Sequence, residues 1–141
     1  MMFVTEVVYG TVAMMRTLEC YRAHCIEHRT KLDPGLYYLL MMSLYQLVYL
    51  DRIPDHAIVN EAVRIAKSRK EGSEKFVNAI LRKLLREGLP AIDTIKRKNK
   101  RYSVQYSLPV WLVKELIGEY GEERACAIFK RLYQRNKSSI R

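Results

Sequence analysis

Three side chains with metal-binding chemistry recur along one face of the first expected helix. Cys20, His24 and His28 stand four residues apart, and residues four apart share a helix face. Thiolate and imidazole are both zinc ligands. The first and last of the three lie about 12 Å apart along the axis, at a rise of about 1.5 Å per residue. One ion cannot readily bridge all three, although His24 with either neighbour could supply two ligands. The sequence therefore favours no metal site, and Cys25 is expected to pack in the core.

Cations give the stronger chemical signal. Residues 61–101 hold thirteen Lys and Arg against five Asp and Glu. Lys75 falls in the first turn of an expected helix, where free backbone N–H groups also favour a phosphate. Candidate phosphate contacts in this part of the chain are Arg64, Lys67, Arg69, Lys70, Lys75, Arg82, Lys83 and Arg86. Each alone is equally well read as a solvated side chain, but the cluster predicts binding to RNA backbone.

A second group of cations follows in a run of six residues. Five of the six are basic: Lys96, Arg97, Lys98, Lys100 and Arg101. We expect a solvated linker and a domain boundary here. The same five side chains are candidate RNA contacts, with a plain basic linker as the alternative.

Aromatic residues come directly after this run. Tyr102 and Tyr106 could stack on single-stranded bases, but packing of the next helix onto the bundle is favoured. Trp111 is expected in the core.

Two asparagines interrupt apolar helical patterns, Asn60 in VNEAV and Asn78 in KFVNAIL. Asparagine is a poor helix former and costly to bury. We therefore predict that both amides are structural and hydrogen-bond backbone across a helix join, with RNA contact as the alternative. Glu61 is expected to pair with a nearby cation rather than to act as a catalytic acid.

Composition bounds the class of protein. The chain has 141 residues, 49% of them hydrophobic, with six Gly and four Pro, which favours one packed, largely helical domain, or one domain and part of another. The net charge of +10 indicates a polyanionic partner. Three cysteines without CxxC spacing indicate free thiols in a reducing cytoplasm. The longest apolar run, 36–50, is shorter than the roughly 20 residues of a membrane span.

The expected elements are all helices. Periodicity and termination signals place them at 2–26, 34–50, 55–68, 73–87, about 90–97, 108–120 and 122–135. Asp33, Asp55, Ser73 and Ser107 are the expected N-caps. Gly88 and Gly121 are expected to end helices.

The quoted segments carry a resemblance to a known family. LVYLDRIPDHAIVNEAVRIAK at 47–67 and EKFVNAILRKLLREG at 74–88 resemble the NusB-like domain. That all-helical fold occurs in the NusB antitermination factor and in the N-terminal RNA-binding domain of bacterial ribosomal RNA 5-methylcytosine methyltransferases, the RsmB or Sun family. TEVVYGT at 5–11 and YSLPVWLVKELIGEYGEERA at 106–125 are similar to the methyltransferases. A free NusB protein would end soon after the KFVN helix.

The chain also departs from the family pattern. The family has an upstream segment that includes its first helix, and it continues into an S-adenosylmethionine-dependent domain with a glycine-rich loop and a Pro-Cys motif. None of these is in this sequence. The resemblance therefore implies an all-α NusB-like bundle without its first helix at 1–99, followed by a helical connector at 100–141. The missing helix would expose apolar surface and favour self-association.

The resemblance implies a function in RNA binding. The chain would position small-subunit ribosomal RNA for methyl transfer from S-adenosylmethionine to cytosine C5, through a cysteine adduct in a domain that this sequence lacks. We expect this chain alone to hold no cofactor or metal, to be inactive, and to lie in the cytoplasm. The alternatives are an antitermination factor that acts with RNA and a ribosomal protein, and a helical adapter whose basic face is incidental.

Overall fold

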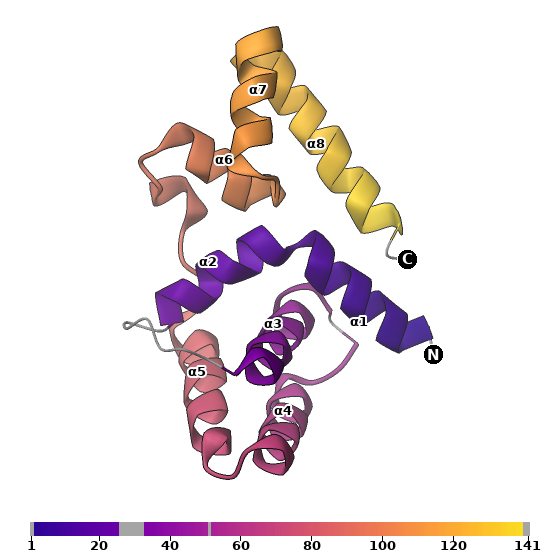
Figure 1. Ribbon diagram of the computed structural model, residues 1–141, viewed down its shortest axis with the longest axis vertical. Helices are drawn as coiled ribbons and strands as arrows, with labels where there is room; N and C mark the ends of the chain where they lie inside the picture. Colours follow the sequence, from indigo (N-terminus) through magenta and orange to yellow (C-terminus); the bar gives the residue numbers. More distant parts are fainter. Residues whose placement is uncertain (1, 26–32, 51, 140–141) are drawn as a thin grey trace. The chain divides into compact units, whose positions relative to one another are not determined.

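The computed structural model describes residues 2–25, 33–50 and 52–139, with side chains described at 4–24, 33–50 and 52–135. Every regular element in these ranges is helical (Figure 1), which confirms the predicted all-α class. The chain divides into two compact units. The terminal unit combines Met1–Cys20 with Ala91–Arg141, and the central unit is Tyr21–Pro90. Residue 99, where the sequence predicts the first domain to end, lies inside α6 (Lys98–Tyr106).

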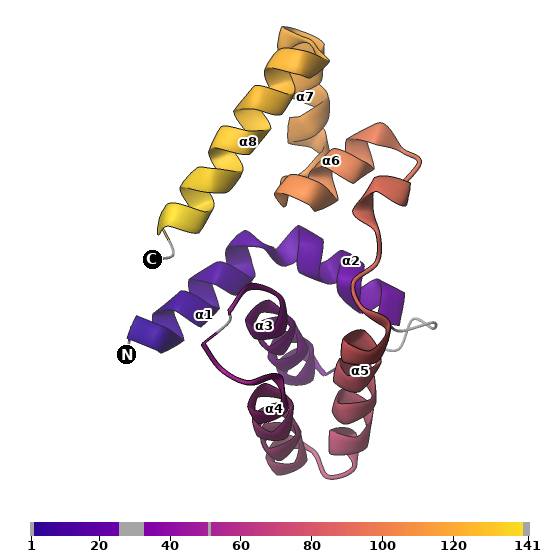
Figure 2. The same cartoon turned by 180° about the vertical axis from the view of Figure 1, so that it is seen from behind.

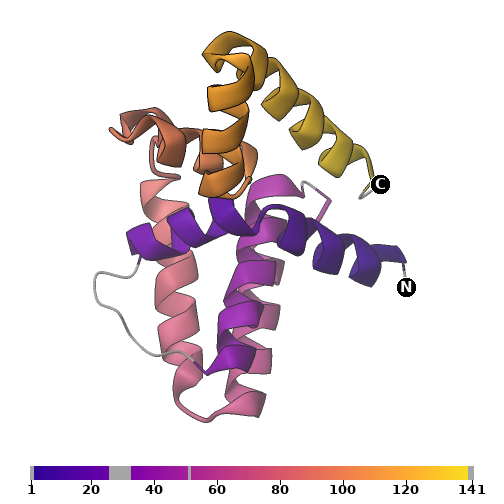
Figure 3. The same ribbon diagram turned by 45° about the horizontal axis from the view of Figure 1, so that its top comes forward.

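The central unit is built on three helices that lie side by side (Figures 1 and 3). They are α3 (Pro34–Tyr49), α4 (Asp55–Arg69) and α5 (Ser73–Glu87), and each packs against the other two. α3 begins with Pro at its first position, as predicted, although Asp33 makes no capping hydrogen bond. The fully buried side chains of this unit include Leu40, Met41, Leu44, Val59, Val77 and Leu81.

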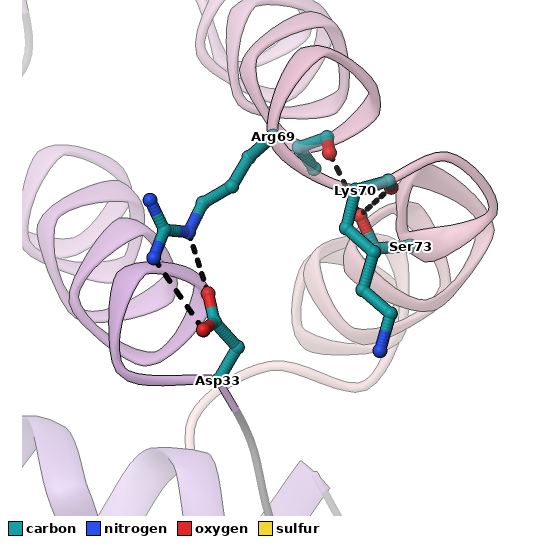
Figure 4. Close-up of polar contacts among 5 residues, drawn as sticks. Asp33, Arg69, Lys70 and Ser73 are labelled. Atoms are coloured by element: carbon teal, nitrogen blue, oxygen red, sulfur yellow. Dashed lines mark hydrogen bonds and ion pairs between the residues drawn. The ribbon is translucent and has the colours of Figure 1, made fainter.

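The join between α4 and α5 depends on Ser73. Gly72, at φ 97°, precedes α5, so Ser73 is the first residue of the helix rather than its N-cap. Its Oγ lies 2.8 Å from the carbonyl oxygen of Ala66 and 2.6 Å from that of Lys70 (Figure 4). The single hydroxyl proton of Ser73 is thus shared between two carbonyl oxygens at the end of α4, each of which also accepts a backbone N–H, and this contact holds the turn.

The two asparagines do not occupy the position predicted for them. Asn60 is exposed. Asn78 is half-buried, and its Oδ1 accepts a hydrogen bond from Arg82 Nε one turn along the same helix, at 3.2 Å. The prediction of buried amides at the helix join is corrected accordingly, because Ser73 provides the polar contact there.

The terminal unit combines α1 (Met2–Ala13) and the first part of α2 (Met15–Cys25) with the C-terminal helices. The latter are η1 (Ile92–Thr94), α6, α7 (Val110–Tyr120) and α8 (Glu122–Ser139). α7 and α8 form a hairpin, seen from behind in Figure 2, that turns at Gly121, whose φ is 82°. α6 packs on both helices of the hairpin.

An aromatic cluster forms the core of this unit. Phe129 of α8 is fully buried, with ring centroids 5.7 Å from Tyr102 and 5.8 Å from Tyr106. Val113 and Ala125 are fully buried in the same cluster. Tyr102 and Tyr106 therefore pack within the helical unit, as the sequence favoured, instead of projecting as base-stacking rings.

Two side chains tie the N-terminal helices into this unit. The predicted single helix at 2–26 is interrupted at Met14, between α1 and α2. The Arg16 N–H donates to Ser107 Oγ at 3.2 Å, and the Thr17 hydroxyl donates to the carbonyl oxygen of Val104. The break therefore leaves the Arg16 N–H outside the helix ladder, and Ser107 at the end of α6 supplies its acceptor.

Ser107 has a different role from the predicted N-cap. It ends α6 in the left-handed conformation, at φ 54°, and α7 begins after Pro109. The Leu108 N–H bonds to the Ser103 carbonyl oxygen at 3.0 Å, the pattern of a Schellman motif, in which glycine usually takes the left-handed position. A serine in the left-handed conformation costs free energy relative to glycine, and its hydroxyl oxygen accepts a hydrogen bond from the Arg16 backbone N–H.

Three further predictions are corrected. Lys98–Arg101 is the first turn of α6 rather than a solvated linker, and the helix expected at 90–97 is only the short η1. Trp111 is 66% exposed, because it lies about 160° around α7 from the buried Val113 at 3.6 residues per turn.

Apolar side chains are exposed on α1. Val4, Val8, Tyr9 and Val12 are all exposed.

Replacing Ser107 tests the α2–α6 junction. We expect Ser107→Ala to lower the free energy of unfolding by about 1–2 kcal/mol, because the partly buried Arg16 N–H loses its acceptor. Ser107→Gly loses the same acceptor but avoids a left-handed cost of roughly 1–2 kcal/mol, so it should be milder. Urea unfolding of the two variants measures the difference. Equal stability of the alanine variant and the wild type would contradict the assigned role.

Candidate RNA-binding surface

The α4–α5 hairpin gathers the first group of predicted cations. Arg64, Lys67 and Arg69 lie on α4, Lys70 follows it, and α5 carries the remaining four. All are exposed except Lys83, which is half-buried. The hairpin thus presents a positive surface built from two helices whose apolar sides form the core.

The arginines of this surface already have partners. Arg64 forms an ion pair with Glu61, as expected for that carboxylate, and Arg82 donates to Asn78. Arg86 lies 4.0 Å from Glu87. Exposed ion pairs contribute only about 0–1 kcal/mol, so a phosphate can compete with them.

Arg69 makes the best-defined of these pairs. Its Nε lies 2.5 Å from Asp33 Oδ2 and its Nη2 3.4 Å from Oδ1, which links the end of α4 to the start of α3 (Figure 4). A side chain at Gly35 would collide with this guanidinium. The hydrogen bond from Arg69 is the main reason that the pKa of Asp33 is lowered.

The lysines differ from the arginines. Lys67, Lys70, Lys75 and Lys83 make no ion pair with any residue that the structure describes. In Figure 4 the ammonium of Lys70 points away from the Asp33–Arg69 pair. These four side chains are the cations of the hairpin that need break no existing contact to meet a phosphate.

The second group of predicted cations lies on the terminal unit and is partly engaged. Lys98 Nζ is 3.1 Å from Glu122 Oε2. Arg101 lies over the Tyr102 ring, with Cζ 5.3 Å from the centroid, and its Nη1 is 3.4 Å from the Ile95 carbonyl oxygen.

Three cations of that group remain. Lys96, Arg97 and Lys100 are exposed and have no ion-pair partner in the described part of the chain.

Glu122 connects α6 to α8 through two donors. The Tyr102 hydroxyl donates to its Oε1 at 2.6 Å, and this bond, followed by that from Lys98, lowers the pKa of Glu122. The Cys126 thiol and the Glu122 carboxylate raise the pKa of Tyr102. These groups have a structural role: each links two helices around the aromatic cluster.

No metal-binding chemistry is evident in the described residues, which contain no group of three His, Cys, Asp or Glu able to hold an ion. Cys20 is half-buried, and burial raises the pKa of its thiol against the opposing charge of Lys100. His28 and the side chain of Cys25 lie outside the described residues. None of the described helices is long and apolar enough to span a bilayer.

Sequence reasoning missed the cations of α8. Arg124, Lys130, Arg131 and Arg135 are all exposed. The signal was present, since no Asp or Glu follows Glu123 in the chain.

The Arg69 contact makes a prediction about pH. We expect Arg69→Gln to raise the pKa of Asp33 towards its ordinary value near 3.9, because the charged donor is lost. The contribution of the wild-type pair to stability is present above that value and is lost as the pH falls through the lowered folded-state pKa. An NMR titration of the Asp33 carboxyl carbon measures the shift. Arg64→Gln is the matched control: it should raise the pKa of Glu61 and leave Asp33 unchanged, and any other pattern contradicts the assignment.

Comparison with known proteins shows which family the chain resembles. The model of the NusB family matches residues 1–86. The chain is 43% identical over 122 residues to a probable ribosomal RNA small subunit methyltransferase B of Bacillus subtilis, covering 86% of this chain and 27% of that protein. It is 35% identical over 132 residues to the Synechocystis protein of the same name, covering 90% and 30%. The chain thus spans less than a third of these relatives, and it belongs to the NusB family.

Proposed function

We propose that this chain is an RNA-binding module that holds small-subunit ribosomal RNA for methylation by a catalytic domain outside residues 1–141. The observation that carries the proposal is the set of four exposed or half-exposed lysines on the α4–α5 hairpin, Lys67, Lys70, Lys75 and Lys83, none of which is paired with a described carboxylate.

The physical argument is electrostatic. An ammonium group that neutralises a phosphate releases a condensed counterion, so each contact adds affinity at low salt. The Arg64, Arg82 and Arg86 side chains lie on the same hairpin, and their present partners are weak competitors at the surface. Lys96, Arg97 and Lys100 of the terminal unit are further candidates.

The relatives support ribosomal RNA as the ligand. Their names describe methyltransferases of the small-subunit ribosomal RNA. Methyl transfer from S-adenosylmethionine to cytosine C5 is what the sequence resemblance implies for the whole enzyme. None of the three cysteines follows a proline, since Glu19, His24 and Ala125 precede Cys20, Cys25 and Cys126. The chain thus lacks a Pro-Cys nucleophile, and we assign no catalytic residue.

Charge reversal on α5 tests the RNA contact. Lys75→Glu combined with Arg82→Glu should weaken binding to a labelled small-subunit ribosomal RNA fragment. It should also make the negative slope of log affinity against log salt shallower by about 1.5–2. Fluorescence anisotropy between low and moderate salt measures both. Lys114→Glu combined with Lys130→Glu makes the same change in net charge elsewhere and should have a much smaller effect. Unchanged affinity of the α5 variant at low salt would remove the hairpin from the interface.

Activity of the isolated chain tests the second half of the proposal. Purified chain with ribosomal RNA and radiolabelled S-adenosylmethionine should transfer no label, because the catalytic groups lie elsewhere. Incorporation of label into RNA would overturn the assignment of this chain as a binding module.

Membership of the NusB family favours one alternative, a transcription antitermination factor. Competition between the ribosomal RNA fragment and an antiterminator RNA separates the two functions. Preference for the antiterminator RNA would support the alternative, and preference for ribosomal RNA supports the proposal.

A further inference from the structure

We propose that α8 carries a second contact surface for RNA backbone, formed by Arg124, Arg131 and Arg135 and called the α8 arginine stripe. The inference rests on the proposed function and extends it to a helix outside the matched family region, which ends at residue 86.

The three arginines share one side of the helix. Spacings of seven and four residues place them within about 40° of one another around the axis, over a length of about 16 Å. All three are exposed, whereas Ala125 and Phe129 of the same helix are fully buried. The apolar side of α8 therefore fixes the helix in the terminal unit and leaves the stripe facing solvent.

No carboxylate in the described part of the chain neutralises the stripe. None of the three arginines makes an ion pair within the described part of the chain. The two acidic residues of α8, Glu122 and Glu123, are in its first turn, and Glu122 is engaged by Lys98 and Tyr102.

The placement of these charges carries a local cost. Arg131 and Arg135 are four residues apart, and like charges at that spacing destabilise a helix by about 0.2–0.5 kcal/mol. Arg124 lies near the N-terminus of α8, where the helix dipole disfavours a cation. A cation near the C-terminus of a helix is stabilised by the helix dipole, which explains the position of Arg135 but not that of Arg124. A polyanion lying along the stripe would relieve both costs.

The chemistry of the stripe suits phosphate. Guanidinium groups bind phosphate through two parallel N–H donors. The same spacing occurs on α5, where Lys75, Arg82 and Arg86 also stand seven and four residues apart. Residues 91–141 hold twelve Lys and Arg against five Asp and Glu, so the stripe lies in a positively charged part of the chain that steers anions towards it.

Paired substitutions test the stripe. Arg124→Gln with Arg131→Gln removes two stripe charges, and Lys114→Gln with Lys130→Gln removes two exposed charges of the same unit that lie outside it. Glutamine keeps good helix propensity, and thermal melts check folding. We expect the stripe variant to bind the ribosomal RNA fragment roughly tenfold more weakly at about 0.1 M salt. Its negative slope of log affinity against log salt should be shallower by about 1.5–2. The control variant should change much less.

A direct readout accompanies the affinities. Modification of arginine by phenylglyoxal, followed by mass spectrometry, should show Arg124, Arg131 and Arg135 protected by the RNA fragment. Protection by polyglutamate but not by RNA would overturn the proposal in favour of an acidic protein partner.

The outcomes separate this inference from the proposed function. If the stripe variant matches its control while the Lys75 and Arg82 variant loses affinity, the stripe is excluded and the RNA-binding function stands. If the stripe variant alone loses affinity, the stripe is supported and the hairpin is excluded. Failure of the wild-type chain to bind RNA at low salt overturns both.

Discussion

Two hydrogen bonds at the junction of α2 and α6 join the N-terminal helices to the C-terminal part of the chain. The Thr17 hydroxyl donates to the Val104 carbonyl oxygen, and the Arg16 N–H donates to Ser107 Oγ. They hold residues 1–20 in one compact unit with residues 91–141, so residues 21–90 leave that unit and return to it. A continuous N-terminal helix would keep the Arg16 N–H inside its own ladder. The break at Met14 and the left-handed conformation of Ser107 are thus two parts of one arrangement.

The positions of the carboxylates decide which cations are held in ion pairs. In the central unit, Asp33 and Glu61 engage two arginines. The four lysines of the α4–α5 hairpin have no ion-pair partner among the described residues. In the terminal unit, Glu122 engages Lys98, and the Tyr102 ring lies beneath Arg101. The exposed arginines of α8 have no such partner among the residues that the structure describes. Net charge alone would weight all these residues equally. Only the contacts show which cations reach a phosphate without first giving up a partner.

Much of the fold follows from local sequence, and the rest depends on distant residues. Periodic apolar residues with Pro34, Gly88 and Gly121 predicted where helices begin and end. The predicted N-caps Asp55 and Ser73 were wrong by one position, since each is the first residue of its helix. A serine or aspartate at a helix start fits either the cap or the first turn. Trp111 and Asn60 were misplaced for another reason. Apolar and amide side chains suit a core or a surface equally well until the neighbouring helices are known.

The contacts of the tyrosines and cations bear on whether the candidate surfaces could distinguish one RNA sequence from another. Phosphate contacts position a protein on nucleic acid, whereas contacts with bases distinguish sequences. The two tyrosines best placed in sequence to stack on bases, Tyr102 and Tyr106, pack instead on Phe129. Exposed lysines are compact point charges without the planar fork of a guanidinium, so the hairpin lysines would attract phosphate with little geometric preference. A guanidinium with no carboxylate partner among the described residues can give more directional contacts to phosphate. On the proposed function, the α8 stripe would therefore govern how RNA is oriented, and the hairpin would govern how strongly it is attracted.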